Sequence, residues 1–272
     1  MNRKHFQPTL KLAFKQVIGR LGYRLRARAG SWGIDLFDDI DKMASCAGFR
    51  VVFDFGANRG QTAKKYLREF PSARIYSFEP GQEAFQSLSS VAAGDKSNRV
   101  VTTQAAVTAR SGRLQLRCFA DCAKNTTNFR LADKFHQEDI QTVECDAVSV
   151  DEFCGANTIT RIDLLKIDVE GAEMEVLRGA ANLLQSGSIG MVLFEHQAIS
   201  PVAGEDNDSL TYLSRCNEYL RGKGYRFVTM YTDGVHENEP SGTYNSLFVH
   251  SSLWGPAAPP VKNAGVQMAG GG

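Results

Sequence analysis

A tight turn near residue 56 has the residue types that could hold a polar ligand. In the segment VVFDFGANRGQTA (51–63), Asp54 precedes Gly56, Asn58 and Gly60. Glycines let the backbone pass close to a ligand, and the helix expected to follow would offer unpaired N–H groups. A dinucleotide-binding turn would have the spacing G-x-G-x-x-G, which this segment lacks. The acid before the glycines suits a ligand with an ammonium or other positive group better than a pyrophosphate.

A second acid, Glu79, lies 19 residues beyond Gly60, at the end of the next predicted strand. An acid in this position can accept hydrogen bonds from both hydroxyls of a ribose. S-adenosylmethionine has a ribose, an amino-acid end and no phosphate, so the two acids together favour it as the cofactor. The alternative is an ordinary strand-to-helix turn, in which Asp54 supports the helix start and Glu79 is a solvated acid.

Three further polar residues follow later strands and should reach the same edge of the sheet. Asp168 ends one strand, and Glu195 with His196 ends the next. If the methyl group of S-adenosylmethionine is transferred to a hydroxyl, that hydroxyl must lose its proton, either to a general base or with the help of a metal ion. Oxygen ligands with one imidazole could bind Mg²⁺ or another divalent ion, so Asp168, Glu195 and His196 are predicted as catalytic and metal-binding residues. The rival is a metal-free mechanism with His196 or Asp168 as the base.

Other charged residues near Asp168 have simpler explanations. Glu173 and Glu175 open a predicted helix, where negative charge is favourable at the helix N-terminus. Glu170, which comes just before them, is more consistent with a functional role. Lys166 lies inside an apolar strand, so its ammonium should extend to water or pair with an acid.

The elements that must position these residues alternate between short apolar runs and helical patterns. This alternation predicts an α/β domain with a doubly wound, mostly parallel, Rossmann-like sheet of about seven strands and helices on both faces. Strands are predicted near residues 50–55, 74–78, 100–107, 142–148, 162–167, 189–194, 226–231 and 246–250. Residues 113–119 should form a hairpin with the third strand, and residues 120–141 form a polar, irregular part of an insertion at about 112–148.

The two ends of the chain differ from the middle. The formal charge is +1, but residues 1–34 hold eight Lys and Arg and no acid, so the rest of the chain carries −7. Residues 10–25 place apolar side chains on one helical face, which predicts a basic amphipathic N-terminal helix. It could pack on the domain at 35–254, or residues 1–28 could contact an anionic membrane. Residues 255–272 are rich in Gly and Pro and should be disordered.

Composition excludes several classes of protein. No apolar run approaches the roughly 18 residues that a transmembrane helix needs. The six cysteines contain no C-x-x-C pair, so we expect reduced thiols and no zinc site. We therefore predict a cytoplasmic protein, membrane-associated if the N-terminal arm binds lipid. Nucleic acid is not an expected partner, because the body of the chain is acidic.

Five segments of the chain resemble the FkbM family of S-adenosylmethionine-dependent methyltransferases. The resemblance extends over about residues 48–250. The segments are VVFDFGANRGQTA (51–63), YSFEP (76–80), IDLLKIDVEGAEMEVLRGA (162–180), MVLFEH (191–196) and YNSLFVH (244–250). The resemblance implies a class I methyltransferase fold and methyl transfer to oxygen on a small-molecule, glycan or glycolipid acceptor. The N-P-P-Y-like strand end of enzymes that methylate bases or glutamine is absent.

The resemblance also implies a set of cofactor-binding residues and leaves two rival functions. The implied cofactor residues are Asp54, Gly56, Ala57, Asn58, Gly60, Glu79, Pro80, Ala106 and Asp168, with Ala105 also near the adenine. A strand-end acidic metal site, as in catechol-type O-methyltransferases, is carried over as an analogy. One rival is a nicotinamide-dependent oxidoreductase, which the missing G-x-G-x-x-G disfavours. The other is a non-catalytic, membrane-recruited module that binds the cofactor.

Overall fold

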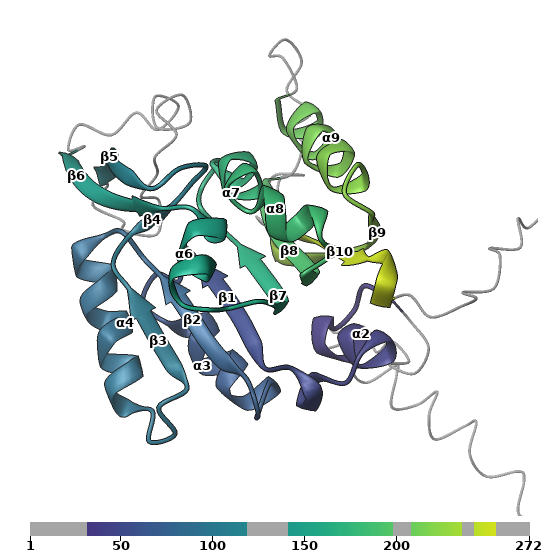
Figure 1. Ribbon diagram of the computed structural model, residues 1–272, viewed down its shortest axis with the longest axis horizontal. Helices are drawn as coiled ribbons and strands as arrows, with labels where there is room; N and C mark the ends of the chain where they lie inside the picture. Colours follow the sequence, from purple (N-terminus) through teal and green to yellow (C-terminus); the bar gives the residue numbers. More distant parts are fainter. Residues whose placement is uncertain (1–31, 119–140, 198–207, 236–241, 254–272) are drawn as a thin grey trace, which may run out of the picture.

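The computed structural model describes residues 32–118, 141–197, 208–235 and 242–253, in which a seven-stranded sheet forms the centre (Figure 1). The strand order is β3-β2-β1-β7-β8-β10-β9. All neighbours pair in parallel except β10, which is antiparallel to both β8 and β9. The bounds are β1 (Val51–Phe55), β2 (Arg74–Phe78), β3 (Val100–Thr103), β7 (Ile162–Ile167), β8 (Ile189–Gln197), β9 (Tyr225–Val235) and β10 (Gly242–His250). The predicted doubly wound, mostly parallel sheet is confirmed.

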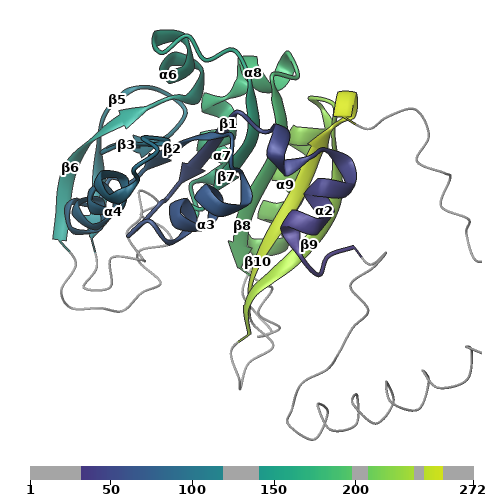
Figure 2. The same cartoon turned by 90° about the horizontal axis from the view of Figure 1, so that it is seen from below.

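Helices cover both faces of this sheet, as Figure 2 shows with α3 and α4 on one side of the strands and α6 and α8 on the other. The helices are α2 (Leu36–Met43), α3 (Gln61–Glu69), α4 (Gln82–Gly94), α6 (Val150–Ala156), α7 (Glu173–Gly179), α8 (Ala181–Gln185) and α9 (Asp208–Arg221). One buried apolar cluster joins the sheet to α6, α7, α8 and α9. The other joins it to α2, α3 and α4. A parallel sheet covered in this way buries both faces of its strands.

The central strands explain where a ligand can bind. β1 pairs with β2 on one side and with β7 on the other, so the chain winds in opposite directions from this point. In open α/β sheets, such a switch point leaves a crevice at the carboxyl ends of the strands. The turn after β1 and the loop after β7 both lie there, which places Gly56 against Asp168.

One strand pairing differs from the prediction. Strands β4 (Ala106–Val107), β5 (Gly112–Cys118) and β6 (Gln141–Val148) form a separate small sheet in the order β4-β6-β5. The partner of β5 is therefore β6, in antiparallel register, and not the third strand, so the predicted hairpin is wrong. The cause is the break in the main-sheet strand after Thr103, which leaves β4 to pair in parallel with β6.

Helix α2 is an element that the sequence analysis missed. Its N-cap is Asp35, whose side chain accepts hydrogen bonds from the N–H groups of Phe37 and Asp38. Within α2, Asp39 is fully buried and accepts a hydrogen bond of 2.9 Å from the hydroxyl of Tyr231 on β9. This bond ties the start of the domain to the edge strand of the sheet.

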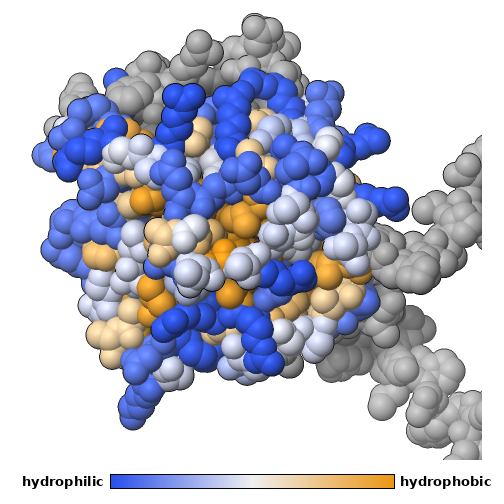
Figure 3. Space-filling view, in the orientation of Figure 1, coloured by the Kyte–Doolittle hydropathy of each residue, from blue (hydrophilic) through white to orange (hydrophobic). Residues whose placement is uncertain are grey.

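The surface of the domain is mostly hydrophilic, as expected when helices cover both faces of the sheet. In the view of Figure 3, hydrophilic residues occupy most of the surface and hydrophobic ones show mainly in patches near its centre. Among the described residues, no helix is long and apolar enough to cross a membrane. The five described cysteines are free thiols. The predictions for residues 1–28, 120–140 and 255–272 lie outside the described residues.

Candidate functional site

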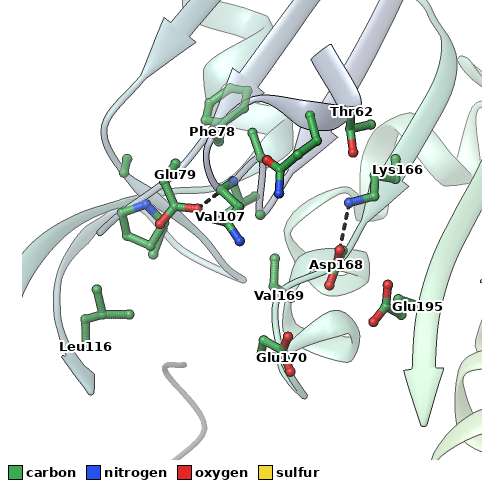
Figure 4. Close-up of a pocket in the computed structure, with 17 residues that line it drawn as sticks. Thr62, Phe78, Glu79, Val107, Leu116, Lys166, Asp168, Val169, Glu170 and Glu195 are labelled. Carbon is green, nitrogen blue, oxygen red and sulfur yellow. Dashed lines mark hydrogen bonds and ion pairs between the residues drawn. The ribbon is translucent and has the colours of Figure 1, made fainter. Parts of the chain in front are cut away.

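A cavity of about 260 Å³ opens at the carboxyl ends of β1, β2 and β7, beside β8 and the small sheet (Figure 4). Its walls come from the turn after β1, the strand end at Glu79, the loop after β7, and Leu116 on β5. The lining residues are Gly56, Ala57, Asn58, Gln61, Thr62, Phe78, Glu79, Pro80, Ala105, Ala106, Val107, Leu116, Lys166, Asp168, Val169, Glu170 and Glu195.

The turn between β1 and α3 is held open by residues in the left-handed backbone region. Gly56, Asn58 and Gly60 have φ angles of +71°, +47° and +86°. A Cβ atom at Gly56 would lie 1.6 Å from the carbonyl oxygen of Asp168, so only glycine fits there. The N–H of Ala57 donates to the carbonyl of Phe78 at 2.9 Å, which fixes the turn against β2. The backbone of this turn therefore forms one wall of the cavity.

Glu79 is held by two backbone donors beside that turn. Its Oε2 accepts a hydrogen bond from the N–H of Asn58 at 2.9 Å, and its Oε1 accepts one from Gly81 at 2.8 Å. Each carboxylate oxygen has a second lone pair that can accept a hydroxyl from a ligand. Burial raises the pKa of Glu79 from 4.5 to about 7, an effect that the two N–H donors oppose and the charges of Asp54 and Asp168 increase. Glu79 is thus a fixed hydrogen-bond acceptor whose charge changes near neutral pH.

This pKa predicts how ligand binding depends on pH. A hydroxyl-bearing ligand that needs ionised Glu79 should bind about ten times more weakly at pH 6 than at pH 8, because the carboxyl is mostly protonated below pH 7. Calorimetric titration with S-adenosylhomocysteine at pH 6, 7 and 8 measures this. The Glu79→Gln variant is the control and should bind weakly at all three values. A wild-type dissociation constant that is constant from pH 6 to 8 would contradict this role of Glu79.

Asp54 lies behind the cavity wall, not in it. It is buried, with an exposed fraction of 0%, and neither of its carboxylate oxygens accepts a hydrogen bond from the residues that the structure describes. Its nearest charge is the ammonium of Lys166, with Nζ 3.6 Å from Oδ1. Burial raises the pKa of Asp54 to about 6, although Lys166 lowers it in part. Asp54, a predicted cofactor-binding residue, is therefore not among the residues that line the cavity, whereas Lys166 is.

Lys166 also pairs with an acid just beyond the end of its own strand. Its Nζ donates to Oδ2 of Asp168 at 2.8 Å, as Figure 4 shows. Asp168 follows β7, and its N–H donates to the carbonyl of Phe55 on β1 at 3.1 Å. The expectation that Lys166 pairs with an acid is confirmed, and the pair fixes one carboxylate at the cavity.

Three acids meet at the end of the cavity near β8. Oxygen atoms of Asp168, Glu170 and Glu195 lie within 4.8 Å of one another, and all three residues are half-buried. Glu170 has a φ angle of +52°, in the tight loop that follows Asp168. The structure thus brings together Asp168 and Glu195, as predicted, and adds Glu170.

His196 is not brought together with these acids. Successive residues of a strand face opposite sides of the sheet, so His196 and Glu195 cannot both face the cavity from β8. The ring of His196 packs against Tyr244, with ring centroids 6.0 Å apart, and its Nε2 lies 2.9 Å from the hydroxyl of Ser246. The structure therefore does not bring His196 together with Asp168 and Glu195, and the cluster of acids near β8 does not include this predicted imidazole ligand.

The remaining predicted cofactor residues have two different positions. Gly56, Ala57, Asn58, Glu79, Pro80, Ala106 and Asp168 line the cavity. Gly60 does not, but its positive φ lets α3 begin directly after the turn, where a Cβ would lie 2.9 Å from a methyl of Val91. The lining residues that the sequence analysis did not assign to the site include Lys166, Gln61, Thr62 and Leu116. Only Lys166 had a signal, because a lysine inside an apolar strand requires a partner.

Comparison with known proteins finds that the chain is similar to methyltransferases. The Methyltransferase FkbM domain matches residues 54–227. The methyltransferase sdnD of Sordaria araneosa is 29% identical over 154 residues, which are 47% of this chain and 59% of that protein. The hexuronic acid methyltransferase AglP of Haloferax volcanii is 28% identical over 156 residues, 56% of this chain and 58% of that protein.

A third relative, the 2-O-methyltransferase NoeI of Sinorhizobium fredii, is 28% identical over 149 residues, 49% of this chain and 58% of that protein. The chain thus spans about three fifths of the length of these relatives. The family match includes the turn after β1, Glu79, and the acids after β7 and on β8, which are the walls of the cavity. The chain belongs to the FkbM family of methyltransferases.

Proposed function

We propose that this chain is an S-adenosylmethionine-dependent O-methyltransferase that acts on a hydroxyl of a sugar-containing or other small-molecule acceptor. The observation that carries the proposal is the position of Glu79. Its carboxylate is fixed by two backbone N–H groups at the rim of the glycine turn. A carboxylate in this place suits a ribose diol and, with no G-x-G-x-x-G turn beside it, a cofactor without a pyrophosphate.

The rest of the cavity supports the same cofactor. Apolar side chains of Ala106, Val107 and Leu116 provide a surface for a flat adenine, next to Pro80. The missing side chain at Gly56 leaves room for the chain of the cofactor to pass close to the backbone. When bound, S-adenosylmethionine supplies a methyl group on a positively charged sulfur. The acids of the cavity favour binding of this positive sulfur over binding of the product, whose sulfur is neutral.

Glu195 is the proposed general base for the acceptor hydroxyl. It lines the cavity from β8, across from Asp168 and Glu170, so a hydroxyl held between the three acids would have a carboxylate to take its proton. Asp168 is less suited to this role, because its Oδ2 is already bonded to the ammonium of Lys166. Asp168 and Glu170 then accept hydrogen bonds that orient the acceptor for in-line transfer.

A divalent metal is not part of the proposal. His196, one of the three predicted ligands, lies on the other face of the sheet, and Lys166 places a positive charge 2.8 Å from an oxygen of Asp168. That ammonium would repel a second cation at the same carboxylate. No step of the proposed chemistry therefore depends on a metal ion.

The acceptor class comes from the relatives and from the chemistry of the site. One relative methylates a hexuronic acid, and another is a 2-O-methyltransferase. Three carboxylates offer many hydrogen-bond acceptors and no donor, which suits an acceptor rich in hydroxyl groups. We therefore propose neutral sugar hydroxyls as the first acceptors to test, before acidic sugars.

The experiment is methyl transfer from labelled S-adenosylmethionine to a panel of acceptors. The panel holds neutral glycosides, uronic acid glycosides, phenols or other non-sugar hydroxyl compounds, and amines. We expect label in a neutral glycoside, with a product heavier by one methylene group. Label transferred only to amines, or to none of these classes while the cofactor binds, would contradict the proposed acceptor class.

A further inference from the structure

We propose that Lys166 binds the carboxylate at the amino-acid end of the cofactor, and so fixes the orientation of that end in the cavity. This inference rests on the proposed function, since it concerns how S-adenosylmethionine is held. It adds a cofactor-binding residue on β7, separate from the glycine turn and from Glu79.

The fold places Lys166 at the cavity by strand register. Lys166 on β7 is the register partner of Asp54 on β1, so the two side chains leave the sheet on the same face. Its neighbours along the strand, Leu165 and Ile167, face the other way, into the core beside α7. The side chain is 9% exposed and lines the cavity. Figure 4 shows its ammonium directed to Asp168, across the cavity from Glu79.

The charge of Lys166 is secured by its surroundings. Burial opposes a positive charge, but the carboxylates of Asp168 and Asp54 outweigh this effect and raise the pKa of Lys166. The residue therefore stays an ammonium throughout the physiological pH range. Asp54, buried behind the wall and without another donor, balances this charge from the protein side.

The partners of the ammonium leave it able to bind an anion. An ammonium has three N–H donors. Asp168 accepts one at 2.8 Å, and Asp54 lies at 3.6 Å, beyond a short hydrogen bond. At least one donor is therefore available to a group in the cavity.

Charge complementarity identifies that group. Among the described residues, Lys166 is the one Lys, Arg or His that lines the cavity, beside the carboxylates of Glu79, Asp168, Glu170 and Glu195. S-adenosylmethionine has two positive groups and a single negative one, its carboxylate. The carboxylate would be repelled elsewhere in the cavity, whereas beside Lys166 it forms a charge-assisted hydrogen bond.

Calorimetric titration with two probes tests this role without any turnover. The probes are S-adenosylmethionine and decarboxylated S-adenosylmethionine, which differ only in the carboxylate. For the full chain with Lys166→Met, we expect the dissociation constant of S-adenosylmethionine to rise by about tenfold or more. The constant for the decarboxylated probe should change by less than about threefold. Lys64→Met, which removes an exposed lysine of α3, is the matched control and should leave both constants unchanged.

A second variant controls for the possibility that Lys166→Met fails to fold. Lys166→Met alone leaves Asp54 buried without a counter-charge, so Lys166→Met with Asp54→Asn is made in parallel and should show the same difference between the probes. Equal weakening of both probes, or no weakening of either, would overturn the inference. So would a wild type that binds both probes equally well, and this result would leave the proposed function intact. A wild type that binds neither probe would instead refute the proposed function itself.

Discussion

The Gly56→Ala variant should lose cofactor binding and at least about 3 kcal/mol of folding stability. The added Cβ would lie 1.6 Å from the carbonyl oxygen of Asp168 and 2.8 Å from the carbonyl carbon, both of them backbone atoms. The residue also has a φ of +71°, which is strained for alanine. Because the turn after β1 and the loop after β7 cannot both keep their positions, the cavity wall must be displaced.

Thermal unfolding and titration with S-adenosylhomocysteine measure the two effects of this change. The matched control is Gly94→Ala at the end of α4, where an added Cβ meets nothing within 4 Å. That variant should unfold within a few degrees of the wild type and bind the ligand normally. If Gly56→Ala matched the Gly94→Ala control in both measurements, the close contact between the two loops would be wrong.

The Glu195→Gln variant should lower kcat by about 10² to 10⁴, the usual contribution of a general base. Glutamine keeps the size and the hydrogen-bonding capacity of the side chain but cannot accept the proton. Since Glu195 is proposed to act on the acceptor, the dissociation constant for S-adenosylhomocysteine should change by less than about threefold. Steady-state rates with an acceptor that the wild type methylates give kcat, and calorimetry gives the dissociation constant.

The adjacent residue provides the control for Glu195. His196 lies on the other face of β8, where its ring packs against Tyr244 and contacts the hydroxyl of Ser246. His196→Gln should therefore leave kcat within about threefold of the wild type. A large loss of kcat for His196→Gln with little loss for Glu195→Gln would reverse the assignment of the base.

Much of the fold could be predicted because each buried strand is a short apolar run with a clear end. Residues 74–78 and 162–167 were predicted with the bounds that β2 and β7 have in the structure. The pairing of β5 could not be predicted in the same way, because its partner β6 is distant in sequence and any alternating strand can pair with several others. Strand existence is a local property of the sequence, whereas strand pairing is not.

The candidate site likewise has features that are local in the sequence and features that depend on strand pairing. Glu79 and Asp168 follow buried strands, so their place at the carboxyl edge could be predicted from the chain alone. Side chains alternate between the two faces of a strand, so the separation of Glu195 from His196 could also be predicted from the sequence. Asp168, which accepts a hydrogen bond from Lys166, is only two residues away in the sequence. The second acid beside Lys166, Asp54, depends on the register between β1 and β7, which only the structure reveals.

Titration of the full chain with S-adenosylmethionine at pH 8 tests the central claim, that this cavity binds this cofactor through Glu79. We expect saturable binding with one site per chain, and binding weakened by about tenfold or more in Glu79→Gln, because the single amide oxygen cannot accept hydrogen bonds as both carboxylate oxygens do. The Lys64→Met variant should bind as the wild type does. Absence of binding at millimolar cofactor, or equal affinity in wild type and Glu79→Gln, would contradict the account.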